Sequence, residues 1–361
     1  MHFLNCFDYH GYANGTTRLK LTQGSMNNIP IPLPPLPEQQ RIVDLIEPLF
    51  EKLGRVKEIA QNALDSFENR KSAILHKAFT GELTAKWREE NGVTPSTVYY
   101  STIKEQRLKI VRGIKEYKEV EEIFDTFDLD ENIKPAGWIK LKAMMVCENI
   151  TCGKTPSDKI SMAGEIPFLK VYNIVNNKID FSYKPQFIDI ETHNGPLKSS
   201  KLLPNDVVMN IVGPPLRKIA IIPNDYCEWS MNQAIVRFRT VDYVNSKFFC
   251  YCLLNNETLD EVIGETKGVV GQANISITQS RNLLIPIPSA EEQKEIVRIL
   301  DNLLENEQKA KELCDVIDKI DLMKKSILAR AFRGELSTNN PDEESAVELL
   351  KEVLRERAEG R

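Results

Sequence analysis

The chain has 361 residues, 42% of them hydrophobic and 27% charged, which suffices for two or three globular domains. The net charge of −5 argues against a uniformly basic nucleic-acid-binding protein, while short apolar runs and an N-terminus unlike a secretory signal predict a cytoplasmic protein. Seven cysteines without a C-x-x-C pair and four scattered histidines predict reduced thiols and no structural zinc site.

The opening of the chain is similar to a segment that occurs much later. GTTRLKLTQ (15–23) aligns with GQANISITQ (271–279), and the two share the glycine, the alternating apolar positions and the Thr-Gln pair. We therefore interpret residues 1–30 as the C-terminal remnant of a first domain, whose complete counterpart lies at residues 132–288.

Residues 31–84 are the first copy of an internal repeat, predicted to be a helical region. IPLPPLPEQQRIV (31–43) aligns with IPIPSAEEQKEIV (285–297), and KSAILHKAFTGEL (71–83) aligns with KKSILARAFRGEL (324–336). Each copy indicates an extended proline-rich entry, a long helix and a glycine stop, at Gly81 and Gly334. Apolar residues at alternating spacings of four and three predict that the two long helices form an antiparallel coiled coil. Pro48 predicts a kink or a fresh start in the first of them.

The part of the chain between the two copies divides into a linker and a domain. Residues 85–131 are predicted to be a charged linker with one short helix at 103–123 and too few apolar residues for a core. Residues 132–288 show short β-rich runs bounded by Gly, Pro and Asn, then a helix at 245–263, which predicts a complete α+β domain. The second helical region follows at 289–337, and residues 338–361 are predicted to form a tail helix.

Charge is unevenly distributed over these segments. Residues 132–288 contain 17 basic and 14 acidic side chains, whereas residues 289–361 contain 13 basic and 18 acidic ones. Because phosphate contacts supply most of the sequence-independent affinity for DNA, this weakly favours the central domain as the DNA-facing part. A near-neutral domain without such a role is an equal alternative on charge alone.

The order of these motifs resembles the specificity subunit of Type I restriction-modification systems. The shared motifs are EQQRIV (38–43), AFTGEL (78–83), GW (137–138), GKTPS (153–157), MNQAIV (231–236), EQKEIV (292–297) and AFRGEL (331–336). The resemblance implies target-recognition domains that each read half of a split sequence in double-stranded DNA. It also implies that the paired helices dock methyltransferase subunits, that restriction subunits join this core, and that S-adenosylmethionine is bound by the methyltransferase, with no cofactor in this chain.

The chain departs from that family in having one complete recognition domain instead of two. One hypothesis is a split or rearranged gene, whose C-terminal product this chain would be. The other is self-association through the conserved helices, so that two chains read a symmetric, interrupted site.

Reading a base sequence requires amide and guanidinium groups on base edges, together with lysines and hydroxyls on phosphates. Polar residues at the turns of the central domain are therefore the candidates for DNA contact: Lys154, Thr155, Ser157, Lys170, Asn173, Arg217, Lys218, Asn232, Gln233, Gln272 and Asn274. Each has an alternative role. Asn232 and Gln233 belong to a motif that the family shares, which favours a role in the fold, and Arg217 and Lys218 could simply solvate a hairpin.

The chain offers no catalytic or metal-binding residues. GKT (153–155) lacks the glycine of a P-loop, since Glu148 stands five residues before Gly153, and NIVGPPL (210–216) lacks the base-holding and stacking groups of an adenine methyltransferase loop. The sequence therefore predicts a non-catalytic subunit. The alternatives are a helical adaptor or silent recognition-domain cassette that does not bind DNA, and a divergent methyltransferase.

Overall fold

The computed structural model describes residues 7, 9–14, 20–129, 133–156, 159–266, 273–313 and 316–359. Two compact units are present: a first unit of residues 1–68 with 307–361, and a second unit of residues 69–306. None of the helices in the described ranges has an apolar stretch long enough to cross a membrane. The mixture of long helices with two sheets confirms the predicted α+β class.

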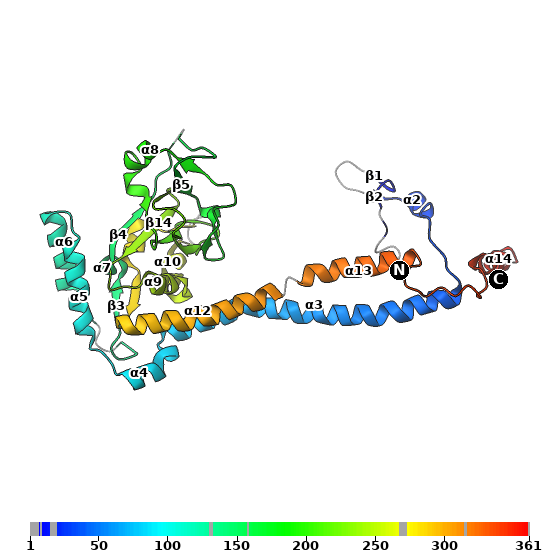
Figure 1. Ribbon diagram of the computed structural model, residues 1–361, viewed down its shortest axis with the longest axis horizontal. Coiled ribbons are helices and arrows are strands. Elements are labelled where there is room, and N and C mark those ends of the chain that lie inside the picture. The colour runs from blue at the N-terminus through cyan, green and yellow to red at the C-terminus, as the bar shows by residue number, and fades with distance from the viewer. Residues whose placement is uncertain are drawn as a thin grey trace. The chain divides into compact units, whose positions relative to one another are not determined.

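The first unit contains most of the long helix α3 (Leu36–Phe79), which continues through Pro48 without a break. Its partner is α13 (Val316–Phe332), and the centre of their contact is formed by Ile46 and Leu328. The Nζ atom of Lys57 lies 2.7 Å from a carboxylate oxygen of Asp321. Ile46 of α3 thus lies near Leu328 of α13, whereas Lys57, further along α3, lies near the earlier residue Asp321. The two helices therefore run antiparallel, as predicted (Figure 1).

The predicted seam is only partly buried in the first unit. Ile46 and Ala60 lie inside, but Leu49 and Val56 remain exposed on α3. The smaller elements of this unit are an antiparallel strand pair, one short helix and a C-terminal helix: β1 (Ala13–Asn14), β2 (Lys20–Leu21), α2 (Gln23–Asn27) and α14 (Ala346–Ala358).

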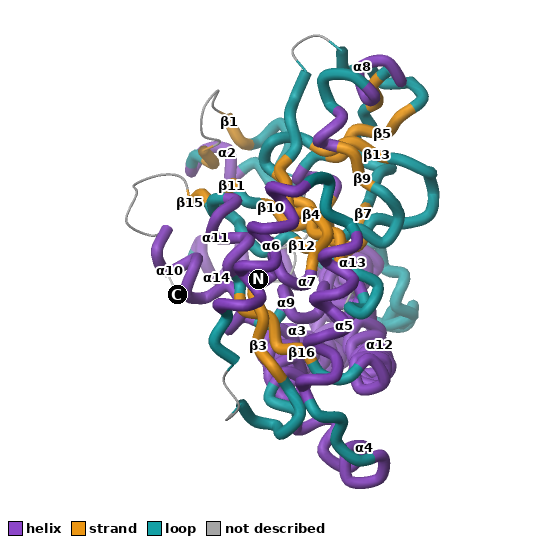
Figure 2. The backbone as a smooth tube through the Cα atoms, turned by 90° about the vertical axis from the view of Figure 1, so that its left-hand side faces the viewer, coloured by secondary structure: helices purple, strands orange, loops and turns teal. Residues whose placement is uncertain are grey.

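Two four-stranded sheets form the centre of the second unit, and Figure 2 shows their strands in orange. The first sheet has the order β12–β10–β14–β4 and is antiparallel throughout. The second has the order β8–β5–β13–β9 and contains one parallel pair, β5 with β13. Their strands are β4 (Cys147–Cys152), β5 (Ile166–Leu169), β8 (Phe187–Ile188), β9 (Lys201–Leu202), β10 (Val207–Asn210), β12 (Ile219–Ile221), β13 (Trp229–Met231) and β14 (Ile235–Thr240).

Three short strand pairs and several helices complete the second unit. The pairs join β3 (Ile139–Lys142) with β16 (Leu284–Ile287), β6 (Ile174–Val175) with β7 (Lys178–Ile179), and β11 (Val212–Gly213) with β15 (Ala273–Asn274). The helices are α4 (Ala85–Asn91), α5 (Ser96–Lys109), α6 (Ile114–Thr126), α7 (Ala143–Val146), α8 (Ile190–Asn194), α9 (Ser246–Leu254), α10 (Asn256–Thr266), α11 (Ile277–Asn282) and α12 (Ala290–Leu313), with 3-10 turns at Glu82–Thr84, Val171–Asn173 and Lys198–Ser200.

The segment predicted as a linker, residues 85–131, is instead part of the second unit's core. Where one helix at 103–123 was expected, α5 and α6 form on either side of Gly113. Tyr99 and Ile103 from α5, with Val120 and Phe124 from α6, join the main hydrophobic cluster. In each helix these residues are four positions apart, so each helix has one apolar face that a neighbouring domain can bury. The segment has no separate core, because its apolar residues pack into the main hydrophobic cluster of the second unit.

The second copy of the repeat contains the helices α12 and α13 within the span 289–337, where one long helix was expected. Residues 314–315, between them, lie outside the described residues. The predicted glycine stops are present, because Gly81 and Gly334 have φ angles of 78° and 72°. A left-handed conformation at these positions ends a helix and favours glycine.

Candidate DNA-recognition surface

The loop after β4 packs directly on the turn after β13. Gly153 donates its backbone N–H to the carbonyl of Ile235 at 3.2 Å. A Cβ atom at this glycine would overlap the carbonyl oxygens of Met231 and Asn232. The two backbones can approach this closely only because Gly153 has no side chain. The GKT segment, which fails as a P-loop, therefore serves as a close-packed neighbour of the MNQ segment.

The close packing of the GKT and MNQ segments brings predicted site residues from both of them together. The hydroxyl of Thr155 hydrogen-bonds to the side-chain oxygen of Gln233, and both residues are exposed. Lys154 is exposed beside them, while its backbone N–H donates to Ser200 at 2.9 Å. Asn232 lies partly beneath this surface, and its Oδ1 is buried without a hydrogen-bond partner among the described residues.

Two further lysines lie on segments that adjoin these two. The parallel pairing of β5 with β13 places Lys170 next to Asn232, whose N–H donates to the carbonyl of Leu169 at 3.1 Å. Lys218 reaches the following residue, since its Nζ donates to the carbonyl of Val171 at 3.3 Å. Lysines from three separate segments thus lie along one connected series of contacts.

Asn210 organises the loop that carries Lys218, and sequence reasoning did not single it out. Its buried side chain accepts a hydrogen bond from the N–H of Lys218 at 2.8 Å. Its amide donates to the carbonyls of Val212 and Pro215, at 3.1 and 2.8 Å. An asparagine three residues before Gly213 of the Gly-Pro-Pro loop is the signal that could have found it, because such side chains often hydrogen-bond to nearby backbone groups in turns.

Arg217 has a different environment from its neighbour Lys218. Its guanidinium donates to the side chain of Asn256 at 2.7 Å and forms an ion pair with Asp260, both on α10. This residue therefore links the loop after β11 to a helix, rather than simply solvating a hairpin.

A contact of Asn173 with DNA is incompatible with its position. The side chain is fully buried, accepts the N–H of Lys170 at 3.1 Å, and donates to the carbonyls of Asp180 and Tyr183, both at 3.1 Å. All its hydrogen-bonding groups are used within the fold. A polar residue at a predicted turn can point inward to satisfy the backbone of that turn, and the sequence pattern does not distinguish this case.

The remaining predicted residues lie near the end of the domain. Asn274 is exposed in β15, directly opposite Val212 in β11, and so flanks the loop that carries Lys218. Ser157 and Gln272 lie outside the described residues.

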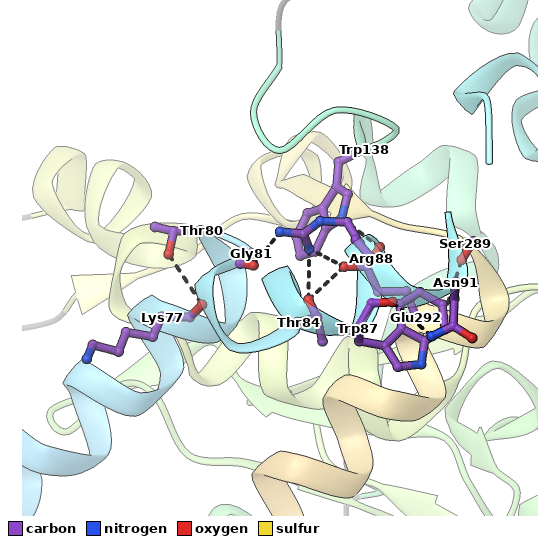
Figure 3. A network of polar contacts seen from close by, with 10 residues as sticks. All are labelled: Lys77, Thr80, Gly81, Thr84, Trp87, Arg88, Asn91, Trp138, Ser289 and Glu292. Atoms are coloured by element: carbon purple, nitrogen blue, oxygen red, sulfur yellow. Dashed lines mark hydrogen bonds and ion pairs between the residues drawn. The ribbon is translucent and has the colours of Figure 1, made fainter. Parts of the chain in front are cut away.

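Three other shared motifs, EQ, AFTGEL and GW, meet at a buried carboxylate instead of at this surface (Figure 3). Glu292, near the start of α12, accepts hydrogen bonds from the hydroxyl of Thr84 at 2.7 Å and from the indole N–H of Trp138 at 3.0 Å, and it pairs with Arg88. Arg88 also donates to the carbonyl of Gly81 at 2.6 Å. The EQ, AFTGEL and GW motifs therefore form one polar network. Its members are well buried, so the network supports the fold and has no group free for DNA.

The other half of the EQ motif has a similar role. Gln293 is fully buried, donates to the carbonyl of Pro288 at 3.2 Å, and accepts the N–H of Asn245 at 2.9 Å. Ser289 accepts the N–H of Glu292 at 3.2 Å, which is half of the expected capping box. The side chain of Glu292 does not complete the capping box, because it bonds instead to Thr84, Arg88 and Trp138.

A buried histidine on α8 lies between a serine and a glutamate. His193 contacts the hydroxyl of Ser230 through Nδ1 at 2.8 Å and the carboxylate of Glu228 through Nε2 at 3.0 Å. Ser230 is fully buried within β13, so no substrate could reach its hydroxyl. Burial lowers the pKa of His193, although the hydrogen bond with Glu228 acts in the opposite direction. This arrangement suits a structural histidine rather than a nucleophilic site. Within the described ranges, no group of three His, Cys, Asp or Glu residues could hold a metal ion.

Comparisons with known proteins identify the family. The model of the Type I restriction modification DNA specificity domain matches residues 2–65 and 135–316, which is more than half of the chain. The chain therefore belongs to the Type I restriction-modification DNA specificity family, and the resemblance found in the sequence is confirmed.

Individual relatives support the same assignment. The EcoBI specificity subunit of Escherichia coli is 24% identical over 360 residues, which cover 96% of this chain and 68% of that protein. The EcoDI specificity subunit of Escherichia coli is 45% identical over 85 residues, or 23% of this chain and 19% of that protein. A chain from a solved type I R-M system superposes with a TM-score of 0.57 at 20% identity, covering 89% of this chain and 66% of its own length, and shows the same fold. The chain thus spans about two thirds of the length of its longer matches.

Proposed function

We propose that this chain is the DNA-sequence-recognition subunit of a Type I restriction-modification complex and that it is not itself catalytic. In this role it directs methyltransferase and restriction subunits to a bipartite target in double-stranded DNA. The observation that carries the proposal is the contact between the exposed Lys154–Thr155 loop and the exposed Gln233, on segments that also adjoin those of Lys170 and Lys218.

The chemistry of that surface fits the two tasks of a DNA reader. Lysine ammonium groups can neutralise phosphates, and a glutamine amide can both donate to and accept from an adenine edge in the major groove. Lys154, Lys170 and Lys218 are assigned to phosphates, with the hydroxyl of Thr155 beside them. Gln233 is assigned to a base edge, because its amide is held in place by Thr155 from the opposite segment.

The catalytic steps are assigned to partner subunits. An exposed apolar stripe runs along α3 in the first unit, formed by Leu45, Leu49, Val56 and Ile59. Their spacing places them on one side of the helix, and exposed apolar stripes of this kind favour docking of another protein. We assign this stripe to methyltransferase subunits, which would bind the S-adenosylmethionine, and restriction subunits would join that assembly.

The experiment measures DNA binding by the full chain together with its methyltransferase, first on sites defined by mapping methylated adenines in the host genome. Lys154→Ala or Lys218→Ala should weaken binding to all duplexes alike. Each should reduce the slope of log affinity against log salt by about 1. Lys86→Ala, which removes an exposed lysine of α4, is the matched control and should change neither quantity.

Gln233→Ala should instead reduce discrimination between the mapped site and a single mismatch, by about 1–3 kcal/mol. Unchanged affinity and discrimination in all these variants would remove this surface as the DNA-binding site. Co-purification with the methyltransferase but no DNA retention would favour the helical adaptor or silent cassette. Binding of S-adenosylmethionine by the isolated chain would favour the divergent methyltransferase.

A further inference from the structure

The loop between β7 and β8, residues 180–186, lies at the same end of the second sheet as Gln233. Strands β5 and β13 lie side by side (Figure 2) and pair in parallel. Lys170 and Gln233 therefore follow them on the same side of the sheet. Strand β8 pairs antiparallel with the other edge of β5, so the 180–186 loop enters β8 on that side as well. The segments of Gln233 and Lys170 and this loop are thus neighbours along one end of the sheet.

Two side chains of the 3-10 turn Val171–Asn173 hold the backbone of the 180–186 loop. The side chain of Asn173, which is fully buried, donates to the carbonyls of Asp180 and Tyr183, both at 3.1 Å. The hydroxyl of Tyr172 donates to the carbonyl of Lys184 at 3.0 Å. The conformation of the loop is therefore fixed by the fold, and its outward-facing side chains have a defined position.

The loop presents an aromatic ring and an ammonium group to solvent. Tyr183 is 53% exposed, and the Nζ atom of Lys184 lies 5.1 Å from the centre of its ring. Lys184 has a φ angle of 49°, a left-handed conformation that is rare for residues with a side chain and is concentrated at functional sites. Asp180, the one carboxylate of the loop, accepts the N–H and the hydroxyl of Ser182, at 3.0 and 2.6 Å. The acidic group is thus satisfied locally, and the ring and the lysine remain available.

Lysines also adjoin the base of the loop. Lys170 directly precedes the turn that holds the loop, and the Nζ atom of Lys218 donates to the carbonyl of Val171, within that turn, at 3.3 Å. Positive charges on both sides of an exposed ring favour a position close to DNA phosphates. The ring itself is then directed at the groove rather than at the backbone.

One group in the major groove matches an aromatic ring. The 5-methyl group of thymine is the apolar feature among the base edges, and apolar side-chain surfaces contact it. An amide such as that of Gln233 reads donors and acceptors, whereas the ring of Tyr183 offers an apolar surface. Insertion of the ring between two bases would require both of its faces, and Lys184 lies over one of them. Contact with a thymine methyl group is therefore the better match.

We propose that Tyr183 determines specificity at one thymine of the target by placing its ring against the 5-methyl group of that base. Lys184 contacts an adjacent phosphate. Tyr172 is a positioning residue, which acts through its hydrogen bond to Lys184. The inference rests on the proposed function, because it takes this end of the second sheet to face DNA. It adds an apolar contact to those assigned to the lysines and to Gln233.

The experiment measures the affinity of the full chain, together with its methyltransferase, for the mapped site in which each thymine is replaced in turn by deoxyuridine. Deoxyuridine lacks only the 5-methyl group, and the site contains thymines because each methylated adenine pairs with one. At one thymine the replacement should weaken binding about fourfold, which is the value of one buried methyl group. Tyr183→Ala should bind thymine and uracil equally at that position. Tyr183→Phe, which retains the ring, should still prefer thymine.

Three further variants separate this role from a general one. Tyr117→Ala removes an exposed tyrosine of α6 and should change neither the affinity nor the thymine preference. Lys154→Ala should weaken binding to thymine and uracil duplexes alike. Tyr172→Phe removes the hydroxyl that holds Lys184 and should reduce the thymine preference at the same position. A purely structural role of Tyr172 would instead lower the affinity for all duplexes and leave that preference unchanged.

The inference is overturned when no thymine of the site is sensitive to uracil in the unchanged chain, or when Tyr183→Ala retains the full preference. It is also overturned when Tyr183→Ala weakens binding to all duplexes but keeps the thymine preference, because the ring would then contact the DNA backbone. Sequence-specific binding without any effect of uracil refutes this inference alone. Absence of DNA binding by the unchanged chain refutes the proposed function, and this inference with it.

Discussion

The two copies of the repeat meet at two junctions, which share a sequence motif but have different surroundings. The covered junction, in the second unit, consists of residues 81–88, 135–142 and 285–293, and the exposed junction, in the first unit, consists of residues 29–41 and 334–343. At both, a glutamine donates to a proline carbonyl and a left-handed glycine ends the opposing helix. At the covered junction, Glu292 receives three side-chain partners, whereas at the exposed junction Glu38 receives Thr338. The motif therefore determines the local backbone, and a neighbouring segment determines how much that backbone contributes to stability.

This difference has an energetic consequence. A buried charge stabilises a fold only when its partners satisfy it, and removing one partner leaves the others buried without compensation. The same substitution at two aligned positions should thus have unequal effects. The comparison can be tested directly, because all three tryptophans, Trp87, Trp138 and Trp229, lie in the second unit. Intrinsic fluorescence consequently reports on the unit with the covered junction.

The largest effect is expected for Glu292→Ala. The substitution leaves Arg88, Thr84 and Trp138 with unsatisfied buried donors, so the second unit should lose about 3–5 kcal/mol of unfolding free energy. Urea unfolding followed by tryptophan fluorescence measures this loss. Glu38→Ala should leave the fluorescence transition unchanged and reduce the stability seen by far-UV circular dichroism by about 1 kcal/mol. Equal losses at the two positions would contradict the comparison.

A second test replaces the two helix-ending glycines. Gly81→Ala and Gly334→Ala both force alanine into a left-handed conformation, which costs about 1 kcal/mol in each case. Only at Gly81 does the added methyl group overlap Pro135, so an additional loss of about 1–3 kcal/mol is expected there. Unfolding in urea gives both values. If Gly334→Ala proved the more damaging change, a cover on the exposed junction that the described residues do not include would be implied.

Much of the fold could be predicted from periodicity and repetition. The long helices, their antiparallel pairing, the glycine stops and the α+β domain all follow from local patterns and from the alignment of the two copies. The prediction that residues 85–131 form a linker was wrong. The sequence of amphipathic helices such as α5 and α6 shows that they have an apolar face, but it does not show which surface buries that face.

The candidate site was less predictable than the fold. The turn residues of the central domain supplied Lys154, Lys170 and Lys218 as candidates. They lie on segments that contact one another, and their contact with DNA stays a prediction. The same criterion, a polar residue at a predicted turn, also selected Asn173, which is buried. A sequence does not distinguish an asparagine that contacts a base from one that stabilises a loop. The covering role of Trp138 depends on a contact with Glu292, 154 residues away, which a single sequence does not reveal.

A smaller effect, confined to the second unit, is expected when the pH is lowered. Because burial lowers the pKa of His193 below the usual value of about 6.5, the folded second unit binds this proton less readily than the unfolded chain does. Its stabilising contribution is present above that pH and is lost as the pH falls below it. Fluorescence-detected urea midpoints should therefore decrease between pH 7.5 and 5.5. The decrease should be smaller in His193→Gln, and an identical pH dependence in that variant would assign the effect to other groups.

The smallest effect is expected at the edge of the exposed junction. Arg41 makes a two-point contact with Glu343, and this hydrogen-bonded carboxylate raises the pKa of Arg41. The Arg41 side chain is 39% exposed and that of Glu343 is 15% exposed, so water and salt compensate for part of the loss of this pair. Arg41→Ala should thus barely change the circular-dichroism transition of the first unit, and raising the salt concentration should remove the remaining difference. A loss as large as that caused by Glu292→Ala would mean that the exposed junction is as well covered as its counterpart.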